Sequence, residues 1–422
     1  MWRIPVLRAG RPYESLERVI LKDFRNGEPV AQVSQANPGL IAKDLHDADQ
    51  KQHILQRHSI AELIGICKRA AFHFLHSDLP LGDHTQSPEE HVKCLSATTG
   101  MPEALCRKNM LKIHSVLQNM ESVLNGLTRS LDLSVLDSGW ASQSDHPISY
   151  LRETDMLGAV LPNNSPGVHS LWLPAVALKV PLALKPGREE PWTPLRIAEA
   201  FLVSGCPPQS FGFYPTDYSG ATQILLKCGR SMLFGDESTV KPWKQDPRIQ
   251  VHGPGWSKIL IGEDKIADWQ NYLDLITTSV VENAGRSCIN ASGVWVTSHG
   301  REIAEALAAR LAKIEARSME DSQAQLAAFT NPKVAARMND WIESRLRREG
   351  ALDLTAEIRG PRLVQKDGAS FLLPTVLWCE DPDHPLANTE FLFPFVSVVQ
   401  VAKQELLKKI GHTLVVTAIT ED

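Results

Sequence analysis

The amino-acid sequence predicts an α/β protein built on parallel β-sheets. From Leu157 onward, short apolar segments of strand length alternate with helical segments. This alternation is typical of a parallel sheet that is covered by helices on both faces. A second alternating unit follows Glu263. The chain has 422 residues, more than one ordinary hydrophobic core supports, so two or three domains are expected.

The composition is that of an ordinary globular protein, with 43% hydrophobic and 22% charged residues. A formal net charge of −5 gives no reason to expect a nucleic-acid or anionic-membrane partner. The N-terminus lacks a signal-peptide pattern, and the apolar stretch 171–184 is too short and too interrupted to span a bilayer. Seven cysteines without paired spacing predict neither a disulfide framework nor a zinc signature. We therefore expect a cytoplasmic protein without membrane insertion.

The N-terminal third divides into two patterns. Residues 1 to about 45 read as short strands and turns, with Asn26-Gly27 as a turn inside the alternating stretch from Ile20 to Ser34. From Ala48 to about Leu131 the spacing of apolar residues is helical. This region is rich in histidine, and His73 and His76 lie three apart. Because no third ligand has a defined spacing, we predict no metal site there.

Residues 132–153 are expected to form a β-hairpin, with strands near 131–135 and 148–151 joined by a polar turn. The strands and helices predicted beyond the hairpin are strands at 158–161, 180–184, 210–214, 231–234, 258–261 and 294–296, a helix from Trp192 to Val203, and a helix with Ile303, Leu307, Leu311 and Ile314 on one face.

Two segments that follow predicted strands carry polar residues suited to binding. In 161–167 (LPNNSPG), Asn164 is either a helix cap or an amide that faces a developing oxyanion. In 184–194 (LKPGREEPWTP), Lys185 lies at the carboxyl end of a buried parallel strand, where ligands bind in open α/β sheets; the alternative is a surface lysine beside a turn.

Two later segments carry a thiol and an acid. Cys288 lies in 282–292 (ENAGRSCINAS), just after a glycine-containing break between a helix and a loop; a lone cysteine is otherwise a small core residue. Glu390 lies in 388–395 (NTEFLFPF), between a loop and an apolar strand, and follows the 374–376 sequence PTV.

Taken together and in order, these four segments resemble the aldehyde dehydrogenase superfamily, in which "PWNFP", "KPSEQTP", "GQxC" and "PTV … EIFGPV" follow one another. The resemblance covers residues 155 to 420 and is diverged. It implies two Rossmann-like parallel-sheet domains with a β-hairpin arm. The implied division is an NAD(P)-binding domain over 1–131 and 154–262, an oligomerisation arm over 132–153, and a catalytic domain over 263–422.

The resemblance also assigns roles by position. Cys288 resembles the catalytic nucleophile, and Asn164 resembles the amide that stabilises the oxyanion together with the backbone N–H of Cys288. The positions that resemble the family's cofactor-binding residues are Pro162, Lys185, Gly235 and Glu390. No G-x-G-x-x-G sequence occurs, which agrees with the different cofactor mode of this family.

The first departure from the family pattern concerns the water-activating glutamate of "ELGGK", whose place is taken by His252. Without that carboxylate, the acyl-enzyme is expected to exchange with a thiol such as coenzyme A, which resembles the acylating, acyl-CoA reductase branch. Alternatively, His252 serves as the base of a hydrolytic enzyme, since an imidazole titrates near neutral pH.

A second departure is Arg188, which replaces the ribose-binding acid of "KPSEQTP". An arginine attracts a 2′-phosphate, so NADP is favoured over NAD; the alternative is a solvated turn residue. Finally, the chain ends where family members continue, so we expect either a fragment, a different assembly or loss of activity, and a homo-oligomer if the C-terminus is completed.

The sequence thus predicts an NAD(P)-dependent oxidoreductase that acts on aldehyde or acyl groups through a thioester on Cys288. Acyl-CoA reduction is favoured over hydrolytic aldehyde oxidation. The rival from another class is a non-catalytic dinucleotide-binding or scaffold protein, in which Cys288 would be unreactive.

Overall fold

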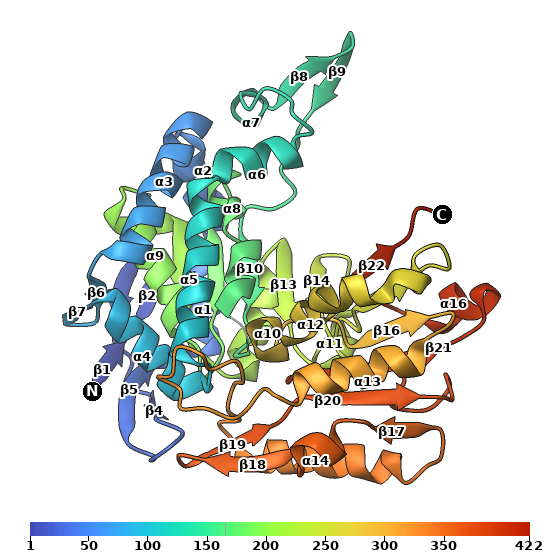
Figure 1. Ribbon diagram of the computed structural model, residues 1–422. Helices are drawn as coiled ribbons and strands as arrows, with labels where there is room; N and C mark the ends of the chain where they lie inside the picture. Colours follow the sequence, from blue (N-terminus) through green and yellow to red (C-terminus); the bar gives the residue numbers. More distant parts are fainter. Residues whose placement is uncertain (165) are drawn as a thin grey trace. The chain divides into compact units, whose positions relative to one another are not determined.

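The computed structural model describes residues 1–164 and 166–422, and the chain forms two compact units. Unit 1 comprises residues 1–23, 27–98 and 106–252, and unit 2 comprises residues 24–26, 99–105 and 253–422. Figure 1 shows both units in sequence colours. The α/β fold class with parallel sheets is confirmed.

Unit 1 is built on a seven-stranded sheet with the order β14-β13-β10-β11-β12-β2-β3. Its strands are β2 (Val6–Arg8), β3 (Arg11–Tyr13), β10 (Leu157–Val160), β11 (Leu182–Lys185), β12 (Phe211–Phe213), β13 (Arg230–Phe234) and β14 (Ile249–His252). The five strands from β14 to β12 are parallel to one another. Strand β2 pairs antiparallel with β12 on one side and with β3 on the other. Strand β14 was not expected from the sequence.

Smaller sheets complete unit 1. They are β1 (Trp2–Ile4), β4 (Arg18–Lys22) and β5 (Pro29–Ser34) in one sheet, the hairpin β6 (Leu79–Leu81) with β7 (His84–Gln86), and the hairpin β8 (Trp140–Gln143) with β9 (His146–Ser149). The helices of this part of the chain are α1 (Pro38–Asp44), α2 (Ala48–Gln56), α3 (Ile60–His76), α4 (Pro88–Thr99), α5 (Glu103–Gln118), α6 (Met120–Leu127), α7 (Val135–Ser138), α8 (Pro174–Ala177), α9 (Trp192–Val203), α10 (Tyr218–Lys227) and α11 (Glu237–Val240).

Unit 2 has a six-stranded sheet with the order β17-β20-β21-β16-β15-β22, in which only β17 is antiparallel. Its strands are β15 (Lys258–Ile261), β16 (Gly293–Val296), β17 (Ala351–Asp353), β20 (Thr375–Cys379), β21 (Phe395–Gln400) and β22 (Val416–Ile419), with β18 (Leu363–Lys366) and β19 (Ala369–Leu372) as a separate pair. Its helices are α12 (Leu273–Val281), α13 (Gly300–Leu311), α14 (Pro332–Leu346), α15 (Ala356–Arg359) and α16 (Lys403–Lys409).

The central strands of the unit 2 sheet, β20, β21, β16 and β15, are buried on both faces, as their apolar sequences predict. In β16, Val294 and Val296 pack into one hydrophobic cluster with α12 and α13, whereas Trp295 packs into a second cluster with α14. Strand β15 alternates in the same way. Each such buried side chain contributes about 1.5–3 kcal/mol relative to exposure, so the two clusters fix the register of the sheet.

Two local expectations are wrong. The predicted hairpin strand at 131–135 is instead a turn that leads into the short helix α7, because Asp132 accepts a hydrogen bond from the Ser134 N–H at 2.8 Å; Gly139 ends α7 with a φ of +78°. The hairpin begins at Trp140 and projects beyond α7 (Figure 1). Residues 38–44 are helical rather than extended, since Asn37 caps the N–H of Leu40 at 2.8 Å.

The boundary between the units falls at His252/Gly253 rather than at 262/263. The reason is that β15 pairs with β16 and β22 and so belongs to the second sheet. Among the residues that the structure describes, no helix combines the length and the apolar character needed to cross a membrane.

Candidate active site

The carboxyl ends of the parallel strands in unit 1 surround a cavity. Strands β10, β11 and β13 run in parallel register, so Val160, Lys185 and Leu233 end at the same edge of the sheet. A cavity of about 530 Å³ opens there. Its lining includes the apolar side chains of Val160, Leu161, Ala221, Leu225, Leu233, Phe234 and Trp243, and the charged side chains of Glu17, Lys185, Arg188 and Asp217. This edge is the usual ligand position in open α/β sheets.

Lys185 is the last residue of β11 and lines the cavity while half-buried. Burial lowers the pKa of its ammonium, and the nearby carboxylates of Glu189 and Asp217 oppose that shift. Within 1–164 and 166–422, its ammonium makes no hydrogen bond. A half-buried cation without a hydrogen-bond acceptor is suited to a hydroxyl or phosphate oxygen of a ligand.

The other positions from the cofactor resemblance lie in loops of the same unit. Pro162 and the half-buried Asn164 follow β10. Arg188 is exposed and lines the cavity. Gly235 stands between β13 and α11, where Asp236 caps the helix by accepting from the Thr239 N–H at 2.8 Å.

His252 ends β14, beside the end of β13. Its imidazole stacks on the ring of Phe234, with centroids 4.4 Å apart and an angle of 11° between the planes. Burial lowers the pKa of the imidazole, and in the described part of the chain its buried Nε2 has no hydrogen-bond partner. Burial thus favours the uncharged ring, and Nε2 is left without a partner among the described residues in either tautomer.

Cys288 belongs to unit 2, in the loop before β16, and its side chain is half-buried. The loop is held by Asn290, which accepts from the Ser287 N–H at 2.8 Å and donates to the carbonyls of Ser279 and Glu282. The Ser257 hydroxyl donates to the Cys288 carbonyl at 2.8 Å. Burial raises the pKa of the thiol, and the charge of Glu390 raises it further.

Glu390 lies against the loop that precedes β15. One of its oxygens, Oε2, accepts from the backbone N–H groups of Gly255, at 2.9 Å, and Trp256, at 2.5 Å. Burial raises the pKa of this carboxyl to about 7, although the two N–H donors favour the charged form. Lys258 donates to the Trp256 carbonyl at 2.6 Å, and burial lowers the pKa of its ammonium to about 8.

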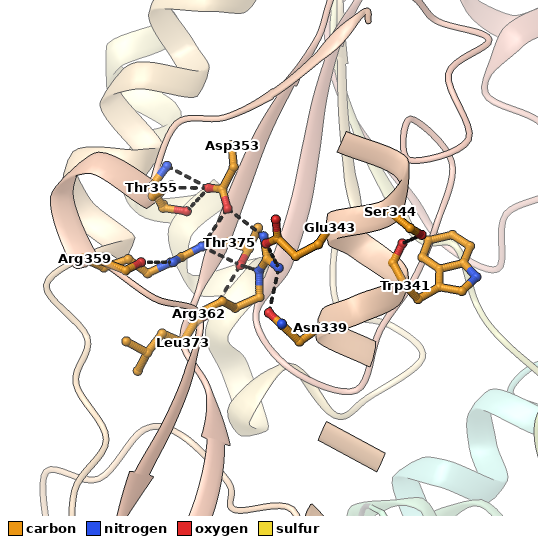
Figure 2. A network of polar contacts seen from close by, with 12 residues as sticks. Asn339, Trp341, Glu343, Ser344, Asp353, Thr355, Arg359, Arg362, Leu373 and Thr375 are labelled. Atoms are coloured by element: carbon orange, nitrogen blue, oxygen red, sulfur yellow. Dashed lines mark hydrogen bonds and ion pairs between the residues drawn. The ribbon is translucent and has the colours of Figure 1, made fainter. Parts of the chain in front are cut away.

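A buried ion network supports the strand that precedes the Glu390 loop (Figure 2). Arg359 and Arg362 both donate to Oδ2 of Asp353 at 2.7 Å. Arg362 also donates to the Thr375 hydroxyl at 2.9 Å, and the Thr375 N–H donates to the Pro394 carbonyl at 3.0 Å. The network therefore fixes Thr375 against the segment that leads from Glu390 into β21.

The predicted site residues are thus divided between the units, with Cys288 and Glu390 in unit 2 and the other six in unit 1. Sequence reasoning missed Lys258 and Asp217. Asp217 follows β12 and caps α10, a signal that could have placed it at the ligand edge. Lys258 opens an apolar strand and gave no signal, because its burial depends on the sheet around it.

The fold is that of an α/β protein with a cavity at the carboxyl edge of a parallel sheet. A sequence model described as the aldehyde dehydrogenase family matches residues 15–410. The chain belongs to this family and is an oxidoreductase of the aldehyde dehydrogenase superfamily, as the sequence resemblance predicted. No curated protein is similar enough in sequence to count as a match.

Solved structures support the fold. The putative aldehyde dehydrogenase from Burkholderia cenocepacia superposes with a TM-score of 0.79 at 17% identity, over 100% of this chain and 86% of that one. The succinate-semialdehyde dehydrogenase from Burkholderia pseudomallei gives 0.78 at 17% identity, with 100% and 86% covered. The NAD⁺ complex of aldehyde dehydrogenase from Bacillus cereus gives 0.75 at 16% identity, with 100% and 84% covered.

Proposed function

We propose that this chain is an NADP(H)-dependent oxidoreductase that reduces acyl thioesters to aldehydes through a thioester on Cys288. The proposal rests chiefly on His252, which stands where the family resemblance places a water-activating glutamate. Its imidazole is stacked on Phe234, and burial lowers its pKa. A base with a lowered pKa removes a proton from water less readily, which favours exchange of the acyl group with a thiol over hydrolysis.

The cavity in unit 1 fits half of a dinucleotide. Its apolar wall, with Leu225, Leu233 and Trp243, suits an adenine ring. Lys185 and Asp217 would bind ribose hydroxyls, and the exposed guanidinium of Arg188 would pair with a 2′-phosphate. When bound, a reduced nicotinamide cofactor would supply the hydride.

The protein side of the reaction begins at Cys288. Its thiolate attacks the acyl carbonyl, and the bond to the leaving thiolate breaks, so the acyl group passes from one sulfur to the other. Asn164 donates an amide N–H to the oxyanion. With the hydride that the cofactor would supply, the enzyme thioester would become a thiohemiacetal alkoxide, which expels the Cys288 thiolate and releases the aldehyde; the thiolate then takes up a proton.

A hydrolytic aldehyde dehydrogenase is the second candidate. The observation in its favour is that the buried Nε2 of His252 has no hydrogen-bond partner in the described residues, so in the tautomer with its hydrogen on Nδ1 the ring has a lone pair free to accept a proton from water. Thus the relative rates of thiol exchange and hydrolysis separate the two candidates.

The test is to incubate the protein with a series of acyl-CoA thioesters and either NADPH or NADH, with C288A as the control. We expect NADPH oxidation and release of free coenzyme A that both depend on Cys288. Replacing Arg188 in R188A should raise the KM for NADPH roughly ten- to a hundredfold, the worth of charge-assisted hydrogen bonds to a phosphate, and leave that for NADH nearly unchanged. Oxidation of free aldehydes to acids without any acyl-CoA turnover would favour the hydrolytic candidate. Absence of both acyl-CoA reduction and aldehyde oxidation would favour a non-catalytic role.

A further inference from the structure

Two neighbouring segments of unit 1 carry residues of the proposed site. The amide segment, residues 161–164 and 166–171, follows β10 and contains Asn164. The lysine turn, residues 185–193, follows β11 and contains Lys185 and Arg188. Because β10 and β11 are adjacent parallel strands, both segments leave the same edge of the sheet.

The first turns of the two segments are joined by two hydrogen bonds, one between backbone groups and one to a side chain. The Leu161 N–H donates to the Lys185 carbonyl at 2.8 Å, and the Glu189 N–H donates to Oδ1 of Asn163 at 3.1 Å. Gly187 approaches so closely that a Cβ atom there would lie 2.6 Å from the Pro162 carbonyl oxygen. A side chain at position 187 would therefore force the segments apart.

A fully buried pair, His169 and Glu190, joins the same segments a second time. Their Nε2 and Oε2 atoms are 2.6 Å apart, and both side chains have an exposed fraction of 0%. The indole N–H of Trp172 donates to Nδ1 of His169 at 3.4 Å. Since an indole N–H can only donate, Nδ1 must accept, so Nε2 carries the hydrogen and donates to Glu190.

The surroundings of the pair make it rigid. The second oxygen of Glu190 accepts from the Thr193 N–H at 2.9 Å, so both carboxylate oxygens are bonded. Arg196 is buried nearby and donates to the carbonyls of Phe74, Ser77 and Gln86. His91 is also buried close by, and burial together with the charge of Arg196 holds the pKa of its imidazole well below its usual range. Breaking the pair would leave polar groups unpaired in a dry interior, which is costly.

We propose that His169 and Glu190 are positioning residues that fix the amide segment and the lysine turn relative to each other. The pair thereby sets the distance between the oxyanion amide of Asn164 and the cofactor-binding side chains of Lys185 and Arg188. This consequence for catalysis rests on the proposed function, whereas the coupling between the two segments does not.

The test is amide hydrogen exchange followed by mass spectrometry on the intact protein and on H169Q and E190Q. The coupling predicts a reciprocal effect: E190Q speeds exchange in residues 159–164, and H169Q speeds it in residues 183–188. We expect roughly a tenfold change in each, the worth of one charge-assisted hydrogen bond. The matched control is D44N, which breaks the Arg8–Asp44 ion pair of 2.6 Å elsewhere in unit 1 and should leave both segments unchanged.

If each variant loosens only its own segment, or if D44N produces the same changes, the proposal is overturned. Should E190Q fail to fold, the effect of H169Q on residues 183–188 decides alone. If the parent protein turns over substrate, H169Q and E190Q should each lower kcat and raise the KM for the cofactor. A protein that turns over no substrate yet shows reciprocal exchange would refute the proposed function and leave the positioning role intact.

Discussion

At the scale of single residues, Cys288 differs from every other cysteine of the chain. The other six cysteines are buried, and Cys288 alone is half-buried. Its environment does not activate the resting thiol, because burial and the negative charge of Glu390 both raise its pKa. Since the thiolate is the nucleophile, the free protein should react slowly at neutral pH.

This environment predicts how the thiol responds to alkylation. Iodoacetamide should modify Cys288 selectively, with a rate that increases as the pH rises beyond the usual range of a free cysteine. In E390Q the repelling charge is gone, so the thiol pKa falls and alkylation at neutral pH becomes faster, roughly tenfold for each unit of pKa. Peptide mass spectrometry measures both, with C288A as the blank. An E390Q profile shifted to higher pH would contradict this electrostatic account.

At the scale of secondary-structure elements, the Asp353 network joins β17, α15 and β20 through two buried arginines that share one carboxylate (Figure 2). The Asp353 carboxylate accepts from both guanidinium groups, and its side chain is 7% exposed. Glu343 also pairs with Arg362, at 2.8 Å, but its side chain is 53% exposed. The two carboxylates therefore bind the same arginine in very different surroundings.

We expect D353N to destabilise the protein by about 3–5 kcal/mol, because it leaves two buried arginines without their shared anion. E343Q, the matched control in the same network, should cost about 1 kcal/mol or less because water screens that pair. Urea unfolding followed by circular dichroism compares the two. Equal losses would mean that burial does not set the strength of this network.

At the scale of the whole molecule, Glu199 in α9 contributes to the dependence of stability on pH. Burial raises the pKa of its carboxyl to about 7. An acid whose folded pKa lies above its unfolded value of about 4.3 binds its proton more tightly in the folded state. The folded state therefore loses relative stability as the pH rises from about 4.5 to about 7, and the loss is complete above that range.

E199Q should then melt at a higher temperature than the parent protein at pH 8, by several degrees, and at nearly the same temperature at pH 4.5. Differential scanning fluorimetry across this range measures the difference. A gain in melting temperature that is equal at both pH values would show that the charge of Glu199 plays no part.

The sequence predicted most of the parallel architecture because buried parallel strands are continuous apolar runs. The strand after Cys288 agrees with the structure in this way, and so does the extent of the helix from Trp192 to Val203. Strand β14 was missed, since its residues are only partly apolar and partly exposed. Likewise, the burial of Lys258 and the pairing of His169 with Glu190 arise from contacts between distant segments, which periodicity does not encode.

The roles of Cys288, Asn164, Lys185, Arg188 and the other predicted site residues came from resemblance and stay predictions. Physical reasoning alone placed Lys185 at a ligand edge, because it ends a buried strand. It could not place Glu390, whose contact with the Gly255–Trp256 loop joins residues far apart in the chain.

The backbone just before Cys288 runs through three successive residues in the left-handed region: Asn283 with φ of 52°, Ala284 with 58° and Gly285 with 67°. D-amino acids prefer this region, whereas L-residues other than glycine adopt it only at a cost in conformational free energy. A Cβ atom at position 285 would also lie 2.5 Å from the Phe393 backbone. Few substitutions at positions 283–285 are therefore compatible with this backbone. Relatives that share this loop should lack β-branched residues at 283–285 even where catalysis has been lost. Selection at these positions then acts on the shape of the loop and not on its chemistry.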